Sequence, residues 1–369
     1  MISTEEQIPL VVDLDNTLLE IDCFHEYIVL FVKKYPFSIW KLPFWLLKGK
    51  AHLKAKVFEV PLSHIEDCPV NADVAQFCSN AHDRGVTVIL ITGTAELIAS
   101  KIKNKFPWIS QVIGSSSKTN MVGSKKLAAL DSQDITCFDF ISDHKRDLPV
   151  FQKARKAYIV GKPAPWASHL TNIVFYFSFN KKNSLRSIFK LIRPYQWVKN
   201  SLILVPLILA HRFSEPHTAH IVALSILAFS AIASSVYISN DLLDFENDRH
   251  HPSKKNRPIP AGLISIPFAL GLGILFFAIG IGIGGCVSKK LTVILLVYVL
   301  LNSAYSTFFK KIPIVDIFVL SSFYIIRLFT GGLVPGIEIS NWLLVYSLPV
   351  FKDEVQYEGL KNPIQAIGN

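Results

Sequence analysis

"YISNDLLDFENDRHHPSKKNRPIPAG", residues 237–262, contains four acidic and four basic side chains directly after a long apolar run. On a helix with 3.6 residues per turn, Asn240, Asp241, Asp244 and Asp248 lie within a sector of about 100°. Three carboxylates on one face repel each other and do not persist beside lipid without cations. We therefore expect the three aspartates to bind Mg²⁺ in an internal polar cavity. A solvated helix end at the membrane surface is the alternative.

Basic side chains follow these acids within the same stretch. Lys254, Lys255 and Arg257 supply anion-binding charge beside the carboxylates. Acids that hold Mg²⁺, next to bases that hold phosphates, predict a diphosphate site. In this interpretation Asn240, Lys254 and Arg257 contact the diphosphate donor.

The apolar residues of the chain are unevenly distributed. Half of the 369 residues are hydrophobic, and they are concentrated after about residue 185 in runs such as "LISIPFALGLGILFFAIGIGIGGCV". Such runs are long enough to cross a bilayer. We predict a soluble domain at 1–165, a basic linker at 166–187, a membrane domain at 188–351 and a polar tail at 352–369. The expected spans are 188–210, 219–241, 263–287, 291–309 and 312–337, with a short sixth at 342–351.

The first half alternates short apolar runs with helical stretches. Residues 9–14, 86–92 and 137–142 are predicted strands, each followed by a plausible helix, as in a parallel α/β sheet. Ligands bind at the carboxyl ends of such strands. The polar residues expected there, or at the start of the helix between the last two strands, are Asp13, Asp15, Thr92, Lys126, Asp143 and Asp147.

Four motifs in order, "DLDNT", "TGT", "GSKK" and "SDHKRD", resemble those of the haloacid dehalogenase (HAD) superfamily of phosphatases over residues 8–162. The resemblance implies a Rossmann-like parallel sheet with a small helical cap. It implies Asp13 as nucleophile, Asp15 as acid and base, and Thr92 and Lys126 as ligands of the phosphoryl oxygens. Asp143 with Asp147 would complete a Mg²⁺ site with Asp13. Lys125 is an equally spaced rival of Lys126, and Ser142 stands where the family has glycine.

Residues 24–50 combine aromatic side chains with lysines and two prolines, and are too interrupted to span a membrane. They form either a helical cap over the phosphatase pocket or a segment on the bilayer surface with its aromatics inserted. We favour the cap. A cap that also contacts the membrane would suit a lipid-linked substrate.

The second half is similar to the UbiA superfamily of membrane prenyltransferases, through "NDLLDFEND" (240–248) and "RPIPAG" (257–262). The resemblance covers residues 184 to about 345. It implies an all-α transmembrane bundle that binds a diphosphate through Mg²⁺. The bundle is expected to be incomplete, because we count five or six spans where the family has about nine. The sequence also becomes polar after residue 351, as in a truncated product.

The second acidic motif of this family is reduced here to Asp316, with Lys310 and Lys311 before it. Together with "RPYQWVKN" (193–200), this resembles the branch that transfers phosphoribose from phosphoribosyl diphosphate to a polyprenyl phosphate. The acceptor phosphate would then be held by Lys199, Lys310 or Arg327. An aromatic prenyltransferase with a fused phosphatase, and a truncated membrane-tethered phosphatase without transferase activity, remain the alternatives.

Charge predicts location and partners. The basic residues cluster beside membrane segments, which favours lipid headgroups and phosphorylated substrates as partners of the +10 chain and argues against nucleic acid. The basic connections place the N-terminal domain in the cytoplasm and the bundle in the inner (plasma) membrane as a multi-pass protein. Lys289 and Lys290 go against this orientation. The partners expected are a polyprenyl lipid, a diphosphate donor and membrane lipid.

Overall fold

A computed structural model describes residues 8–60, 65–116, 119–178, 183–212, 214–309 and 312–339. The chain forms two compact units. The first comprises Met1–Ser184 and Leu243–Pro267, and the second comprises Leu185–Leu242 and Phe268–Asn369.

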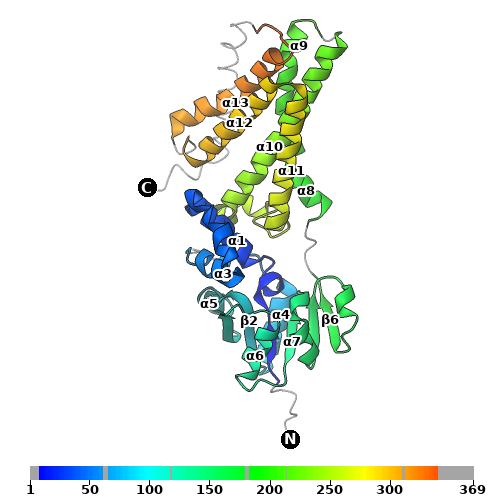
Figure 1. The fold of residues 1–369 in the computed structure, drawn as a ribbon. Helices are drawn as coiled ribbons and strands as arrows, with labels where there is room; N and C mark the ends of the chain where they lie inside the picture. The colour runs from blue at the N-terminus through cyan, green and yellow to red at the C-terminus, as the bar shows by residue number, and fades with distance from the viewer. Residues whose placement is uncertain are drawn as a thin grey trace. The chain divides into compact units, whose positions relative to one another are not determined.

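The first unit is built on a six-stranded parallel sheet with the order β3-β2-β1-β4-β5-β6 (Figure 1). The strands are β1 (Leu10–Val12), β2 (Val88–Ala95), β3 (Ile109–Ser115), β4 (Asp139–Ser142), β5 (Ala157–Val160) and β6 (Ile173–Phe177). Strand β1 is central, with Val11 paired to Ile89 on one side and to Phe140 on the other. The predicted parallel α/β sheet is therefore confirmed.

Helices α4 (Ala72–Asp83), α5 (Glu96–Lys105), α6 (Ser124–Asp131) and α7 (Leu148–Lys153) connect the strands. The core between sheet and helices includes Val11, Phe140 and Phe151, all fully buried. Strand β6 pairs with β5 and lies within the predicted linker 166–187. The boundary predicted at residue 165 therefore falls before the last strand, because the polar turns around residue 165 resemble a domain end although the sheet continues beyond them.

A group of helices lies between β1 and β2 in the sequence. It contains α1 (Cys23–Lys34), a 3₁₀ turn (Pro36–Ser38), α2 (Lys41–Leu47) and α3 (Lys50–Val57). Asp22 caps α1 by accepting hydrogen bonds from the amides of Phe24 and His25. The small helical cap expected from the sequence is therefore present.

The second unit is helical. Its elements are α8 (Leu185–Ile192), a 3₁₀ segment (Pro194–Leu204), α9 (Val205–Leu209), α10 (Pro216–His250, whose end from Leu243 belongs to the first unit), α11 (Ile266–Val287), α12 (Lys289–Thr307) and α13 (Pro313–Leu333). Helices α10, α11 and α12 are long and apolar enough to cross a membrane, and Phe318–Leu333 is a shorter apolar helix. The chain is a membrane protein.

The span predicted at 188–210 is not one helix. Arg193 adopts a left-handed conformation with φ of 56°, and a 3₁₀ segment follows before α9. Pro194 and Pro206 stand at the starts of the two elements after the break, where proline is tolerated. The other four long spans correspond to α10–α13, and the short sixth at 342–351 lies outside the described residues.

Close packing of small residues joins helices of the second unit. A Cβ atom on Gly280 would lie 2.6 Å from Ile232 Cγ1, so α11 approaches α10 closely only because this residue is glycine.

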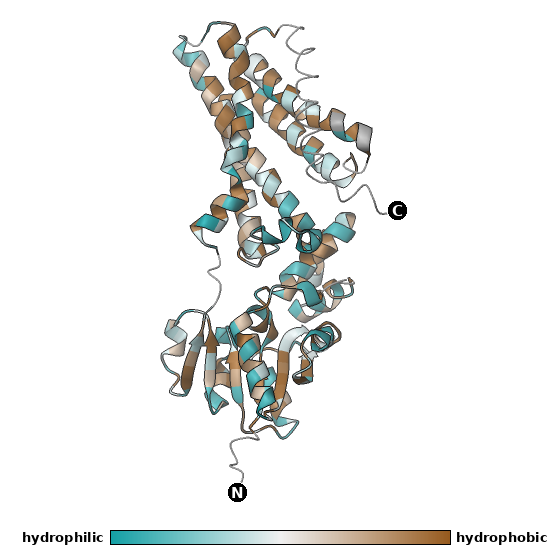
Figure 2. Ribbon diagram, turned by 180° about the vertical axis from the view of Figure 1, so that it is seen from behind, coloured by the Kyte–Doolittle hydropathy of each residue, from teal (hydrophilic) through white to brown (hydrophobic). Residues whose placement is uncertain are grey.

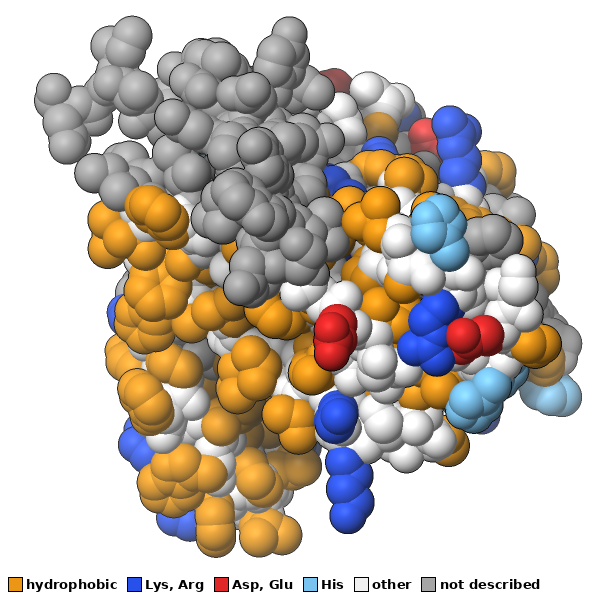
Figure 3. All heavy atoms as spheres, turned by 90° about the horizontal axis from the view of Figure 1, so that it is seen from above, with side chains coloured by type: hydrophobic (Ala, Val, Ile, Leu, Met, Phe, Trp, Pro, Cys, Tyr) orange, Lys and Arg blue, Asp and Glu red, His pale blue; other side chains and the backbone are white. Residues whose placement is uncertain are grey.

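Hydropathy colouring shows brown along α10 and α11 and in the buried strands of the sheet (Figure 2). Exposed hydrophobic side chains also gather on the face seen in Figure 3. Large apolar residues such as Ile274 and Leu300 are exposed on α11 and α12, as expected for contact with lipid.

Candidate functional site

The central strand β1 delivers Asp13 to the carboxyl edge of the sheet. The Asp13 amide donates to the Ile141 carbonyl of β4 at 3.0 Å, which fixes the position of the residue. Its carboxylate accepts a hydrogen bond from the Leu14 amide at 2.9 Å. The Asp13 side chain is buried at the carboxyl end of β1. In a parallel sheet, ligands bind at this end of the strands, so the carboxylate is positioned to act as a nucleophile.

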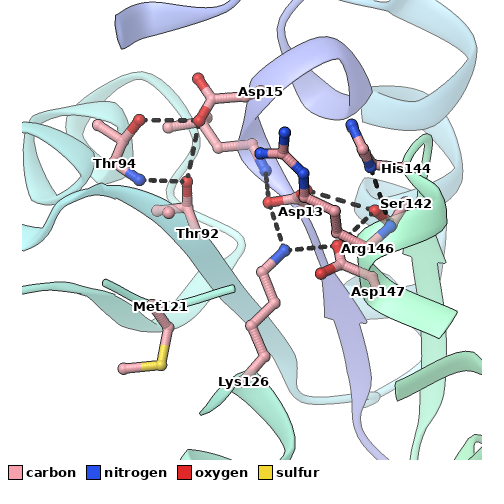
Figure 4. A network of polar contacts seen from close by, with 12 residues as sticks. Asp13, Asp15, Thr92, Thr94, Met121, Lys126, Ser142, His144, Arg146 and Asp147 are labelled. Carbon is pink, nitrogen blue, oxygen red and sulfur yellow. Dashed lines mark hydrogen bonds and ion pairs between the residues drawn. The ribbon is translucent and has the colours of Figure 1, made fainter. Parts of the chain in front are cut away.

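A cation and a hydroxyl join Asp13 to a second carboxylate (Figure 4). Lys126 Nζ lies 3.0 Å from Asp13 Oδ1 and 2.8 Å from Asp147 Oδ2. Ser142 Oγ donates to Asp147 Oδ2 at 2.8 Å and to Asp13 Oδ2 at 3.3 Å. Lys126 is buried whereas Lys125 is exposed, so Lys126 is the lysine that reaches the site. Ser142, noted from the sequence only as a departure, is a member of this network.

Asp15 is held by a different set of donors. Thr94 Oγ1 donates to Asp15 Oδ2 at 2.8 Å, and the Cys23 amide at the start of α1 donates to Oδ1 at 2.9 Å. The predicted Thr92 is farther from Asp15, at 3.4 Å, and also accepts from the Thr94 amide. Thr94 was missed because both threonines of "TGT" satisfy the motif equally. Only the strand geometry separates them.

Burial and charge change the proton affinities in this network. Burial, with the carboxylates of Asp147 and Asp15, raises the pKa of Asp13 to about 7, while Lys126 opposes the rise. Burial and the charge of Asp22 also raise the pKa of Asp15. For Lys126, burial lowers the pKa, but Asp13 and Asp147 outweigh it and the net shift is upward. A raised pKa suits Asp15 as a proton donor.

Asp13, Asp15, Lys126 and Asp147 line a cleft of about 90 Å³. The cleft is also lined by residues that the sequence did not single out, among them Asp22, Lys50, Lys54, His144 and Arg146. Lys54, on α3 of the cap, donates to the Gly93 carbonyl at 2.7 Å, and burial lowers its pKa. Lys54 was missed because it is one of seven lysines in the cap region, and no local pattern marks the one that faces inward.

The same cleft was predicted to hold Mg²⁺ through Asp13, Asp143 and Asp147. All three line it, and their carboxylate oxygens are the ligand type that Mg²⁺ prefers. Burial, and to a smaller extent the carboxylates of Asp147 and Asp15, raise the pKa of Asp13, and a bound cation would lower it again. Within the described part of the chain, however, no three acidic, histidine or cysteine side chains are grouped closely enough to hold a metal. The donor chemistry fits Mg²⁺, and the assignment stays a prediction.

The predicted acidic face of α10 carries carboxylates paired with arginines. In the second unit, Asp241 is buried and accepts from Arg193 at 2.5 Å. In the first unit, Asp248 is buried and accepts from Arg257 at 2.7 Å. Asp244, between them on the helix, is half-buried. The helix is as predicted, and metal binding by its aspartates stays a prediction.

Residues 243–267 are anchored within the first unit by a buried ion pair. Arg249 forms a two-pronged contact with Glu26 of α1, in which Nη1 donates to Oε2 at 2.9 Å and Nη2 donates to Oε1. Their side chains are 6% and 4% exposed. Gly262 lies so close to Glu20 that a Cβ atom would be 3.1 Å from its carbonyl oxygen. Sequence patterns gave no signal for this pairing, because 223 residues separate the partners.

The other predicted substrate-binding residues are divided between the two units. Asn240 accepts from Ser306 at 3.0 Å, and Asp316 accepts from the Tyr305 hydroxyl at 2.6 Å. Lys199 lies 5.8 Å from the centre of the Tyr324 ring. Half-buried Lys254 belongs to the first unit, and Lys310 and Lys311 lie outside the described residues.

Arg327 is buried within the helices of the second unit. Its guanidinium donates to the Asn200 side-chain oxygen at 2.8 Å, to the Tyr298 hydroxyl at 3.1 Å and to the Phe323 carbonyl at 2.6 Å. These partners are neutral groups. An arginine charge held in this way inside a membrane domain is costly, which is typical of a functional position.

Comparison with known proteins found a family match in the second half. Residues 201–351 match the UbiA prenyltransferase family. Decaprenyl-phosphate phosphoribosyltransferase of Corynebacterium glutamicum is 36% identical over 168 residues, which cover 44% of this chain and 51% of that protein. The chain thus spans about half the length of this relative.

Two further similarities extend to the first half. The protein y4nM of Sinorhizobium fredii is 29% identical over 351 residues, covering 94% of this chain and 68% of that protein. The apo structure of phosphoserine phosphatase aligns with a TM-score of 0.33 and 15% identity, covering 50% of this chain and 98% of that chain.

Proposed function

We propose that the chain joins a phosphomonoesterase to a UbiA-type transferase that moves phosphoribose from phosphoribosyl diphosphate to a polyprenyl phosphate. The phosphatase assignment rests on one observation. At the end of β1, the buried Asp13 carboxylate lies 3.0 Å from the Lys126 amine. A nucleophilic carboxylate beside a fixed cation is what phosphoryl transfer requires. The similarity over residues 201–351 supports the transferase.

In the phosphatase, Asp13 attacks phosphorus and forms an aspartyl phosphate as the bond to the leaving oxygen breaks. Asp15 gives its proton to that oxygen, then takes a proton from the water that hydrolyses the aspartyl phosphate. Lys126 balances charge on the phosphoryl oxygens, and Thr92 is their other ligand. Thr94 and the Cys23 amide orient Asp15 for both proton transfers.

Mg²⁺ is the cofactor proposed for both sites. In the cleft, Asp13, Asp143 and Asp147 would hold it, where it would neutralise charge on the phosphoryl group. On α10, Asp241, Asp244 and Asp248 would hold Mg²⁺ with the donor diphosphate. Arg193 neutralises Asp241 and Arg257 neutralises Asp248, so each arginine would be released from its own carboxylate when metal binds.

The preference for a phosphoribosyl donor rests on charge. A polyprenyl phosphate brings its own negative charge next to a metal-bound diphosphate, and cationic groups must neutralise it. Arg327, buried among neutral partners, together with Lys199 and Lys310, would supply that charge, while Asn240, Lys254 and Arg257 contact the donor. The relative from Corynebacterium glutamicum bears the name of this activity.

The fusion follows from the chemistry of the product. A lipid-linked ribose 5-phosphate is a phosphomonoester, which is the substrate class of the first unit. We place the helices in the inner membrane and the phosphatase in the cytoplasm, where phosphoribosyl diphosphate is made available.

The transferase is tested in membranes that contain the chain, supplied with ribose-labelled phosphoribosyl diphosphate and polyprenyl phosphate. We expect label in the lipid fraction, and no label with Asp244→Asn. Transfer of a prenyl chain onto 4-hydroxybenzoate without ribose incorporation would instead identify an aromatic prenyltransferase.

A further inference from the structure

The outer cap face, defined here as residues 35–47, exposes large hydrophobic side chains. They belong to the 3₁₀ turn, to α2 and to the residues around them, and include Tyr35, Phe37, Trp40, Phe44 and Leu47. Phe37 is 93% exposed and Leu47 is 84% exposed. Several large apolar side chains exposed within one short segment of a folded domain are typical of a site of interaction with another protein or with a membrane.

The charged side chains of the surrounding segment all have one sign. From Tyr27 to Phe58 the chain carries seven lysines and neither aspartate nor glutamate. Lys33, Lys34 and Lys48 are exposed at the edges of the outer cap face, and Lys41 is half-buried within it. An apolar segment whose own charged residues are all positive is complementary to a partner that is apolar inside and anionic at its surface.

We propose that the outer cap face binds the anionic surface of a lipid bilayer, with its aromatic side chains among the headgroups and acyl chains. Helix α2 has seven residues, far short of the roughly 20 that span a bilayer. The segment therefore lies in the interface. Basic residues that flank inserted aromatics are typical of such segments.

Lysine amines on the outer cap face lie close to aromatic rings, as is typical of segments at membrane interfaces. Lys41 Nζ is 5.8 Å from the Trp40 ring, and Lys34 Nζ is 5.5 Å from the Tyr35 ring. The aliphatic parts of such lysines lie along apolar surface while their amines reach the phosphates. Contact with a second copy of the chain is disfavoured, because a two-fold interface would bring the same positive face against itself.

The membrane-crossing helices keep a bilayer present wherever the chain is folded, so this contact needs no additional partner. The other side of the cap supplies Lys54 to the phosphatase cleft. A cap bound to the bilayer would thus keep the cleft near lipid-borne phosphomonoesters. This last consequence rests on the proposed function, but the lipid contact and its test do not.

The test uses the full chain in nanodiscs, with exposed Cys137 and Cys286 replaced by serine. Spin labels are placed at Phe37→Cys and Leu47→Cys, and their accessibility to oxygen and to a water-soluble nickel complex is measured. A label at Leu97→Cys is the control, because Leu97 is 80% exposed in the same unit but lies on α5, outside the cap. A variant with Lys33, Lys34, Lys41 and Lys48 all changed to glutamine tests the charges.

In phosphatidylglycerol discs we expect the labels at 37 and 47 to be reached by oxygen more than by nickel, and the label at 97 to show the reverse. The difference should shrink in phosphatidylcholine discs and in the glutamine variant. Nickel accessibility at 37 and 47 equal to that at 97 would overturn the proposal. Protection from both reagents would also overturn it, since that result means contact with protein.

Discussion

Two acid-rich regions of this chain differ in how their charges are arranged. At the sheet edge, Asp13, Asp147 and Lys126 converge from three elements into one buried network. On α10, Asp241 and Asp248 are each paired with a separate arginine. The carboxyl ends of parallel strands lie at the same edge of the sheet, so side chains that follow them can meet. Acids along one helix are instead kept apart by the rise of the helix between them.

The difference suggests two modes of action. The sheet site has its cation in place before substrate arrives, so binding needs little rearrangement. In the proposed function, the arginines paired with the α10 aspartates would have to exchange a carboxylate for a ligand. We therefore expect mutations at the first site to affect the rate of chemistry, and mutations at the second to affect binding.

The largest effect is expected at Asp13. Asp13→Asn keeps the shape but removes the nucleophile, and should lower the phosphatase kcat by a factor on the order of 10⁴ or more. Phosphate release from a generic phosphomonoester by the full chain measures this. Asp139→Asn is the matched control, because Asp139 is paired with Arg155 away from the cleft. Equal activity in wild type and Asp13→Asn would refute the assignment.

The next effect concerns the anchor of residues 243–267. Glu26→Ala leaves Arg249 buried without its carboxylate and should destabilise the first unit by about 3–5 kcal/mol. Hydrogen exchange of the α1 amides in the full chain measures the loss. Glu59→Ala breaks an exposed pair with Lys56 and should cost under about 1 kcal/mol. If the two variants exchange equally, the buried pair is not an anchor.

A smaller effect is expected at the centre of the acidic helix face. Asp244→Asn removes one charge at nearly constant shape and should weaken donor binding about 10- to 100-fold. Calorimetric titration with phosphoribosyl diphosphate and Mg²⁺ in detergent checks this. Unchanged affinity would mean that this helix end is merely solvated surface.

The smallest expected effect is a change in the pH dependence of phosphatase activity at the sheet site. Asp13 must be ionised to attack, so activity is lost as pH falls through its pKa, which burial and neighbouring carboxylates raise to about 7. A cation at the cleft would lower that pKa. We expect the acidic limb of kcat/KM to move to lower pH as Mg²⁺ is raised from limiting to saturating. A limb that does not move with Mg²⁺ would contradict a metal site beside Asp13.

The sequence predicted much of the sheet site because three of the four motifs lie at strand ends, which a parallel sheet brings together, and the fourth opens α6. Ser142, Thr94 and Lys54 escaped prediction, since their roles depend on side-chain direction within correctly placed elements. The break after α8 was not predicted, because the apolar residues continue through it and the left-handed backbone conformation of Arg193 leaves no mark in the sequence. The Arg249–Glu26 pair escaped because only the tertiary fold brings the two residues together.

In the proposed function, both sites act in sequence on one lipid. This order of action is tested most directly with phosphoribosyl diphosphate labelled with ¹⁴C in the ribose and ³²P at the 5-phosphate, added with polyprenyl phosphate to membranes containing the chain. With wild type we predict ¹⁴C in the lipid fraction and ³²P released as inorganic phosphate. With Asp13→Asn both labels should stay in the lipid in equal amounts. Equal retention of both labels by the wild type, or an absence of ¹⁴C from its lipid fraction, would contradict the account.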